Sequence, residues 1–150
     1  MSEESGELVL ELERVLPSPP ATVFRAFADP PTLAAWWGPE GFTIPALDFP
    51  ARAGASYRIE MQPPEGDPFN LIGEFREVKE PERLVFTFVW EQPDPDDVEM
   101  LAELTFEDFG NQTRATLRQK PFKTEERLSL HRDGWTDSFN KLEALLKRAP

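Results

Sequence analysis

The sequence contains no cysteine and only one histidine, His131. The lack of cysteine excludes disulfides, thiolate nucleophiles and zinc sites with cysteine ligands. A catalytic triad would have to use His131, and a zinc site would need carboxylates for nearly all its ligands, which is uncommon. No nucleophile elbow or other local sign of a serine hydrolase is present. We therefore expect no metal, no cofactor and no catalytic residues, and we favour a protein that is not an enzyme while leaving that question open.

Positive charge and long apolar runs are also scarce. The 150 residues hold 28 acidic and 16 basic side chains, which gives a formal net charge of -12 without any basic cluster. Nucleic acids and anionic lipids need such a cluster, so we expect neither a nucleic acid nor a membrane as partner. No apolar run approaches the roughly 20 residues of a membrane span. The acidic first residues lack the positive and apolar segments of a secretory signal, which favours a cytoplasmic protein.

Aromatic residues are plentiful, and two tryptophans, Trp36 and Trp37, are adjacent. Asp29 as N-cap and two prolines in the first turn predict a short helix before them, and Gly38-Pro39 ends it. On that helix Leu33, Trp36 and Trp37 stand at i, i+3 and i+4, which gives it more apolar area than two turns need. A larger part of the molecule must cover these two rings. Because adjacent residues are about 100° apart around a helix, we expect one ring to pack under the sheet and the other to border an opening.

Strand patterns dominate the middle of the chain. Leu8, Leu10 and Leu12 alternate with less apolar residues, as in a strand with one buried face. Ser18 is expected to cap a helix with Val23, Phe24 and Phe27 on one side, just before the tryptophan helix. Turn-rich separators between the later runs favour antiparallel hairpins, so we expect a meander in a sheet of about seven strands. The later strand-like runs cover residues 42–49, 56–61, 70–79, 83–90, 98–106 and 113–120.

Residues 124–148 are typical of one long helix. Thr124 and two glutamates form its first turn and Lys147-Arg148 its last, as the helix dipole favours. Five apolar residues share one face: Leu128, Trp135, Phe139, Leu142 and Leu146. The whole chain, residues 1–150, then forms one α+β domain in which a bent antiparallel sheet wraps around this helix. Such a sheet need not be filled to its centre, so the enclosed space is a candidate hydrophobic cavity.

Twelve side chains are candidates for lining that cavity. Any single one of them is more often packed core than a ligand contact, but together they favour a pocket. The candidates are Trp36, Trp37, Phe42, Tyr57, Phe75, Phe86, Phe88, Trp90, Leu128, His131, Trp135 and Phe139.

Two polar residues fall in phase with apolar faces. His131, between Leu128 and Trp135, either contacts a ligand or is satisfied by a neighbouring carboxylate or carbonyl, and we favour the second alternative. Arg14 is in phase with Leu12, so it either meets an acidic ligand group or reflects a register slip or an arginine that reaches the rim of the strand, and we again favour the second alternative.

Several motifs resemble those of a known family. Residues 18–27, followed by Asp29-Pro30 and by the run from Trp36 to Phe42, resemble the signature of small bacterial proteins related to the C-terminal domain of the Hsp90 ATPase activator. Residues 81–87 and Gly134-Trp135 fit the same AHSA1-like pattern over nearly the whole chain. The resemblance implies the helix-grip fold of the SRPBCC superfamily, which includes START-like lipid-transfer domains, Bet v 1-like birch-pollen allergens and polyketide cyclases. Their common feature is a hydrophobic cavity between the sheet and the C-terminal helix.

Three functions are compatible with these observations. We favour a monomeric or homodimeric protein that binds a small apolar or amphipathic ligand, such as a lipid, in the cavity. The resemblance offers an alternative, a stress-related protein that contacts an Hsp90-type chaperone, although 150 residues leave no room for the separate N-terminal domain of the eukaryotic activator. The third alternative is a cyclase-like enzyme that uses His131 or Arg14.

Overall fold

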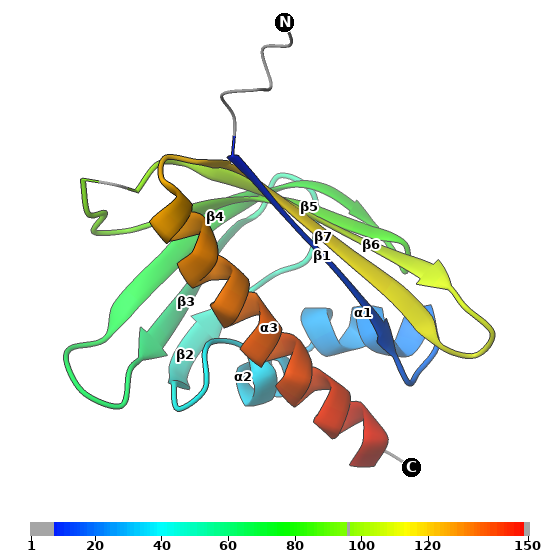
Figure 1. Ribbon diagram of the computed structural model, residues 1–150. Coiled ribbons are helices and arrows are strands. Elements are labelled where there is room, and N and C mark those ends of the chain that lie inside the picture. Colours follow the sequence, from blue (N-terminus) through cyan, green and yellow to red (C-terminus); the bar gives the residue numbers. More distant parts are fainter. Residues whose placement is uncertain (1–7, 96, 149–150) are drawn as a thin grey trace, which may run out of the picture.

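A curved antiparallel sheet and a long helix across its concave face form the framework of the computed structural model (Figure 1), which describes residues 8–95 and 97–148. The strands follow the order β1-β7-β6-β5-β4-β3-β2, so β2 to β7 form a meander and β1 pairs with β7 at one edge. The expected α+β helix-grip fold is therefore confirmed. The strands are β1 (Leu8–Leu16), β2 (Thr43–Asp48), β3 (Ser56–Gln62), β4 (Phe69–Lys79), β5 (Arg83–Trp90), β6 (Met100–Asp108) and β7 (Thr113–Phe122).

Two short helices, α1 (Pro20–Ala28) and α2 (Pro30–Trp36), follow β1 as the sequence predicts. The oxygen Oδ2 of Asp29 accepts a hydrogen bond from the Thr32 backbone N–H at 3.2 Å, which confirms Asp29 as the N-cap of α2. The prediction that Ser18 caps α1 is wrong. Pro19 occupies that position and has no side-chain acceptor, so the Thr22 backbone N–H bonds to the Pro19 carbonyl at 2.9 Å instead.

The tryptophan helix α2 is one residue shorter than the sequence predicts. It ends at Trp36, and Trp37 is its C-cap, with the extended backbone angles φ -70° and ψ 139°. Gly38 then takes a positive φ of 99°, a conformation that glycine adopts without steric cost. Because the backbone leaves the helix between them, the two indole rings are free to pack against different elements.

The long helix α3 (Glu125–Arg148) lies across the sheet, with its C-terminal half beside α2 and β1 (Figure 1). The helix begins one residue later than expected, and the Thr124 hydroxyl caps it by accepting a hydrogen bond from the Arg127 backbone N–H at 3.1 Å. Trp135, Phe139, Leu142 and Leu146 are buried on its inner face, whereas Leu128 is only partly covered. The core therefore lies between this face of α3 and the concave side of the sheet.

Candidate functional site

The turn that follows Trp37 is fastened to α3 by hydrogen bonds. Ser138 on α3 accepts from the Gly38 backbone N–H at 2.9 Å, and Asp137 accepts from the Glu40 backbone N–H at 3.0 Å. Lys141 donates to the Pro39 carbonyl at 3.4 Å. We call these contacts of residues 38–40 with residues 137, 138 and 141 the turn clamp. It fixes the C-terminal half of α3 over the sheet.

The two tryptophans are both buried and contact each other, with ring centroids 5.8 Å apart, but each also packs against a different helix. Trp36 is fully buried against Phe27 of α1, with ring centroids 4.7 Å apart, and its indole N–H donates to the Ala26 carbonyl at 3.1 Å. Trp37 is 4% exposed and meets the Trp135 ring of α3 at 5.2 Å. The expectation that one of them borders an opening is therefore wrong in this structure. The Trp37 ring instead packs against the inner face of α3.

Three further candidates form a packed aromatic cluster in the sheet. Tyr57, Phe75 and Phe86 surround Phe49, with ring centroids between 4.8 and 5.8 Å from it, and all four are buried. The Tyr57 hydroxyl donates to the Thr87 carbonyl at 2.6 Å, and burial raises the pKa of this phenol well above its usual value. This cluster holds the sheet's curved end together.

The remaining aromatic candidates form a path from the surface to the inner face of α3. Phe42 and Phe69 are only partly buried, with centroids 6.0 Å apart, and Phe69 contacts Trp90 at 5.4 Å. Trp90 contacts Phe88 at 5.5 Å, and Phe88 continues to Trp135 at 6.4 Å. We call these five rings the aromatic path. Phe139 lies beyond its inner end, 5.8 Å from Trp135.

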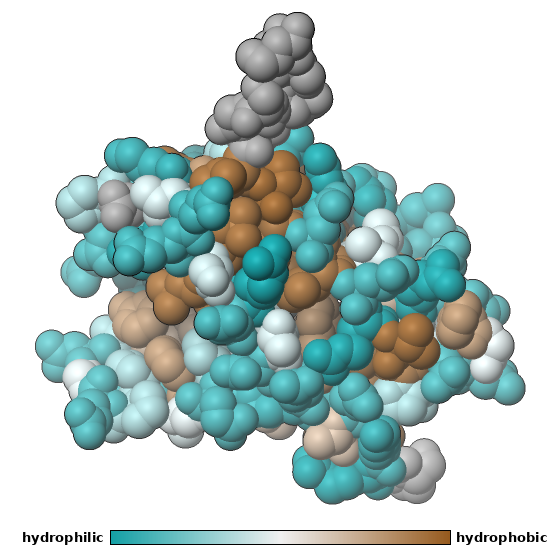
Figure 2. All heavy atoms as spheres, viewed as in Figure 1, coloured by the Kyte–Doolittle hydropathy of each residue, from teal (hydrophilic) through white to brown (hydrophobic). Residues whose placement is uncertain are grey.

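Apolar side chains also reach the surface around the N-terminal half of α3. Figure 2 shows brown apolar atoms gathered beside this half of the helix, near β1. Leu8 and Leu12 of β1 and Leu128 of α3 are partly buried and pack against the core. On the opposite side Leu130 is 57% exposed, one turn before Gly134, which faces Pro39. The N-terminal half of α3 is therefore flanked by accessible apolar surface.

His131 connects the aromatic path to α3. Its Nδ1 lies 2.8 Å from the Arg127 carbonyl, which can only accept, so Nδ1 carries the proton. Its Nε2 then accepts from the Trp90 indole N–H at 3.2 Å. Burial lowers the pKa of His131, and the Arg127 carbonyl and the charge of Asp97 only partly offset this effect. The ring is therefore neutral and uses both nitrogens inside the protein.

A second polar pair lies deeper between α3 and the sheet. Gln119 of β7 is fully buried, and its Oε1 accepts from the Trp135 indole N–H at 2.8 Å. The sequence analysis missed Gln119, although it follows Thr113, Ala115 and Leu117 in the inward phase of a correctly predicted strand. Alternation alone could have identified it. Phe69 was missed because it lies at the end of a turn-rich separator.

Arg14 lies at the rim between β1 and α3, where it forms an ion pair with the helix. Its Nη1 is 3.1 Å from Oε1 of Glu143 on α3, and the two side chains are 26% and 31% exposed. Its pairing with Ala115 is in register, so the strand does not slip there. Arg14 joins strand to helix through this ion pair.

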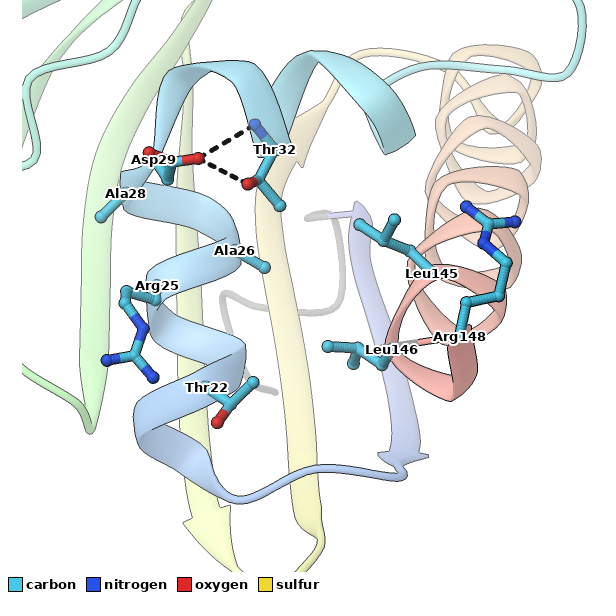
Figure 3. A pocket seen from close by; sticks show the side chains of 9 residues that line it. All are labelled: Thr22, Arg25, Ala26, Ala28, Asp29, Thr32, Leu145, Leu146 and Arg148. Carbon is cyan, nitrogen blue, oxygen red and sulfur yellow. Dashed lines mark hydrogen bonds between the residues drawn. The ribbon is translucent and has the colours of Figure 1, made fainter. Parts of the chain in front are cut away.

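Two open grooves lie elsewhere on the surface. One, of about 620 Å³, separates α1 from the end of α3; Leu145 and Leu146 point across it, whereas Arg25 points away (Figure 3). The other, of about 520 Å³, crosses the outer side of β3, β4 and β5 and includes Tyr57. Of the twelve cavity candidates, only Tyr57 lines either groove.

Residues 8–95 and 97–148 contain neither a candidate metal site nor a candidate membrane-spanning helix. No group of three or more histidine, aspartate or glutamate side chains there is placed to hold a metal ion. Nor is any helix in these ranges long and apolar enough to cross a membrane.

Comparison with known proteins places this architecture in a family. The chain matches the family described as activator of Hsp90 ATPase homolog 1-like protein, AHSA1, over residues 17–147. No curated protein matches it. A structure of the AHSA1 protein from Silicibacter pomeroyi is 31% identical, with a TM-score of 0.82, 93% of this chain and 98% of that chain covered.

Two further solved structures share the fold at similar identity. A Chromobacterium violaceum protein is 28% identical, with a TM-score of 0.86, 94% of this chain and 98% of that one covered. A Nitrosomonas europaea protein is 29% identical, with a TM-score of 0.80, and the match covers 99% of this chain and 97% of that one. With the match to the family over residues 17–147, these similarities lead to one conclusion: the chain belongs to the AHSA1-like family.

Proposed function

We propose that this protein binds a small apolar or amphipathic ligand between the N-terminal half of α3 and the sheet. The observation that carries the proposal is the aromatic path, which runs from the partly exposed rings of Phe42 and Phe69 to the buried ring of Trp135. Large rigid rings offer much contact area to an apolar ligand at little entropic cost. The family's fold, a sheet around a helix, is consistent with a binding protein.

The contacts of α3 indicate which half would move. Its C-terminal half is held by the turn clamp and by the ion pair of Arg14 with Glu143. Its N-terminal half is held by two side-chain hydrogen bonds, from Trp90 to His131 and from Trp135 to Gln119, and by the ion pairs of Arg127 with Asp97 and with Asp94, whose carboxylate is largely exposed. Exposed ion pairs contribute little free energy. Because the interior is packed, a ligand enters by displacing Trp90 and this half of the helix.

Binding of the neutral dye N-phenyl-1-naphthylamine tests the proposal. The dye should give a saturable 1:1 rise in fluorescence, and a fatty-acid methyl ester or a flavonoid should compete with it. Phe69→Ala removes a partly buried ring at the outer end of the aromatic path and should weaken dye binding about 3- to 10-fold. Val15→Ala, a truncation of an exposed apolar residue of β1 outside that path, should leave it unchanged. A linear, unsaturable dye response in the wild-type protein would refute the proposal.

The alternative is association with an Hsp90-type chaperone, as the description of the family suggests. One structural observation favours it: the exposed Leu130 stands beside Glu126 and Asp133 on the outer face of α3, a combination that suits a basic, apolar partner surface. Pull-down with a purified bacterial Hsp90 and measurement of its ATPase rate test this reading. If the chaperone is not captured and its ATPase rate does not change, ligand binding remains the proposed function.

A further inference from the structure

We infer that the ligand of this site carries an uncharged hydrogen-bond acceptor, such as a ketone or ester carbonyl, which binds the side-chain amide of Gln119. The inference rests on the proposed function and adds the chemical class of the ligand. It follows from one buried donor that the protein leaves poorly satisfied.

The orientation of the Gln119 amide is fixed by its neighbour. The Trp135 indole nitrogen is only a donor, so the atom 2.8 Å away must be the amide oxygen of Gln119. The amide nitrogen, with two N–H groups, therefore points to the other side. Its partner among the described residues is the sulfur of Met100, at 3.4 Å.

A structural role explains the oxygen of Gln119 but not its nitrogen. The oxygen satisfies the indole of Trp135, which would otherwise be a buried unpaired donor. A thioether sulfur is a weak acceptor, and it cannot take both N–H groups of a side chain that is fully buried. Buried donors are normally paired with oxygen or water, so this nitrogen is ready for a better acceptor.

The side chains around the amide can make room for a ligand. Met100 is unbranched and adapts its shape readily, so its sulfur can leave the amide without distorting the backbone. Ala102 stands opposite Gln119 on the neighbouring strand and adds little bulk. Phe88, the inner ring before Trp135 on the aromatic path, approaches the same tryptophan from β5. A ligand that follows this path therefore reaches Trp135 and its hydrogen-bond partner.

The charge of the ligand follows from the same surroundings. The buried polar and charged side chains among the described residues are Ser18, Thr87, Thr113, Gln119, His131 and Ser138. This set includes no lysine or arginine, and the His131 ring is neutral. A carboxylate without a paired cation is costly to bury, whereas a neutral carbonyl needs only one or two donors. The site therefore favours ketones and esters over fatty-acid anions.

Two compounds of equal shape test the inference. Acetophenone and α-methylstyrene differ by a carbonyl oxygen in place of a methylene group, and benzoate supplies the anionic comparison. In NMR titrations of the intact protein we expect acetophenone to bind more tightly than benzoate. The ratio of the α-methylstyrene Kd to the acetophenone Kd should fall about 3- to 10-fold in Gln119→Met, the value of one hydrogen bond.

Gln112→Met, at an exposed turn position, is the matched control and should keep the wild-type ratio. Because Gln119→Met leaves the Trp135 indole unpaired and could impair folding, the side-chain amide signal of Gln119 is also followed in the wild-type protein. Acetophenone should shift this signal and α-methylstyrene should not. Equal ratios in both variants, or equal shifts with both compounds, overturn the inference but leave ligand binding intact. If neither compound nor the dye binds, the proposed function fails as well.

Discussion

At the scale of single residues, two glycines have opposite roles. A Cβ atom on Gly73 of β4 would lie 2.1 Å from the Thr87 carbonyl oxygen and 2.6 Å from Cε2 of Tyr57. Gly73 thus lets the Tyr57 ring cross the strand and reach Thr87. A Cβ atom on Gly134 of α3 would meet only Pro39, at an ordinary 3.6 Å.

The two alanine substitutions should therefore change the free energy of unfolding in opposite directions. Gly73→Ala should lower the free energy of unfolding by about 3 kcal/mol or more, because backbone cannot yield as a side chain can. Gly134→Ala should raise it by up to about 1 kcal/mol, since alanine is the better helix former. Urea unfolding followed by tryptophan fluorescence measures both. Similar losses for the two variants would contradict the contacts described for Gly73.

A second residue-scale prediction concerns pH and His131. Burial lowers the pKa of this ring in the folded chain, whereas in the unfolded chain it is about 6.5. The unfolded state then takes up the proton first, so the stabilising contribution is complete above about pH 6.5 and declines as the pH falls below it. Protonation also turns Nε2 into a donor that faces the Trp90 N–H.

His131→Gln should reduce the loss of stability between pH 7 and pH 5, because glutamine does not titrate and can still accept from Trp90. The free energy of unfolding at pH 7, 6 and 5 tests this in both proteins. Glu143 does not interfere, because its bonds to Lys147 and Arg14 lower its pKa and its effect appears only below about pH 4.5. An identical decline in both proteins would refute the assignment.

At the scale of elements, the run from Trp36 to Gly41 contains residues that are needed to contact α3. Gly38 supplies the positive φ, and its N–H and carbonyl both contact the Ser138 hydroxyl, at 2.9 and 3.2 Å. This hydroxyl also lies 2.9 Å from the Gly134 carbonyl one turn earlier. The turn after Trp37 therefore positions α3 through these hydrogen bonds.

Removal of that hydroxyl tests the turn clamp. Ser138→Ala should lower the free energy of unfolding by about 1–3 kcal/mol, because it leaves the buried Gly38 N–H without its partner. Ser129→Ala, an exposed serine of the same helix, should change it by less than about 0.5 kcal/mol. Hydrogen exchange should also accelerate at the Gly38 and Glu40 amides in Ser138→Ala alone. Unchanged exchange there would mean that the turn does not depend on α3.

The elements themselves could be predicted from the sequence because each depends on short-range patterns. Alternation located the strands to within two residues at nearly every end, and the charges at residues 125–126 and 147–148 marked the ends of α3. The cap of α1 could not be predicted in this way, because consecutive prolines replaced the usual side-chain bond at Ser18. Alternation shows which way a residue points but not which element it meets. Trp36 and Trp37 therefore looked like one surface, although they pack against α1 and α3.

At the scale of the whole molecule, the side chains at the proposed ligand site are closely packed. Phe88, Trp135 and Phe139 are each at most 5% exposed, and side-chain volumes rather than residue types determine whether space remains between them. The sequence could not supply that information. A ligand has to open this packing, so its apparent affinity is reduced by the free energy of opening.

This coupling predicts that a loss of packing on the path improves binding. Phe88→Leu and Phe75→Leu each shorten a buried ring of the sheet and should each lower stability by about 1–3 kcal/mol. Only Phe88 contacts Trp90, His131 and Trp135, whereas Phe75 lies among Phe49, Tyr57 and Phe86. Space created beside an apolar site can take up an apolar molecule. Phe88→Leu should therefore bind N-phenyl-1-naphthylamine several-fold more tightly than the wild-type protein.

Phe75→Leu, with a comparable loss of stability, should bind the dye as the wild-type protein does. Dye titration and urea unfolding of the same samples separate the two effects. If both variants gained affinity equally, the dye would be responding to general loosening of the fold. If neither gained, opening at the aromatic path would not limit binding, and the ligand would have to enter on the side of Leu8 and Leu12, where β1 meets the same half of α3.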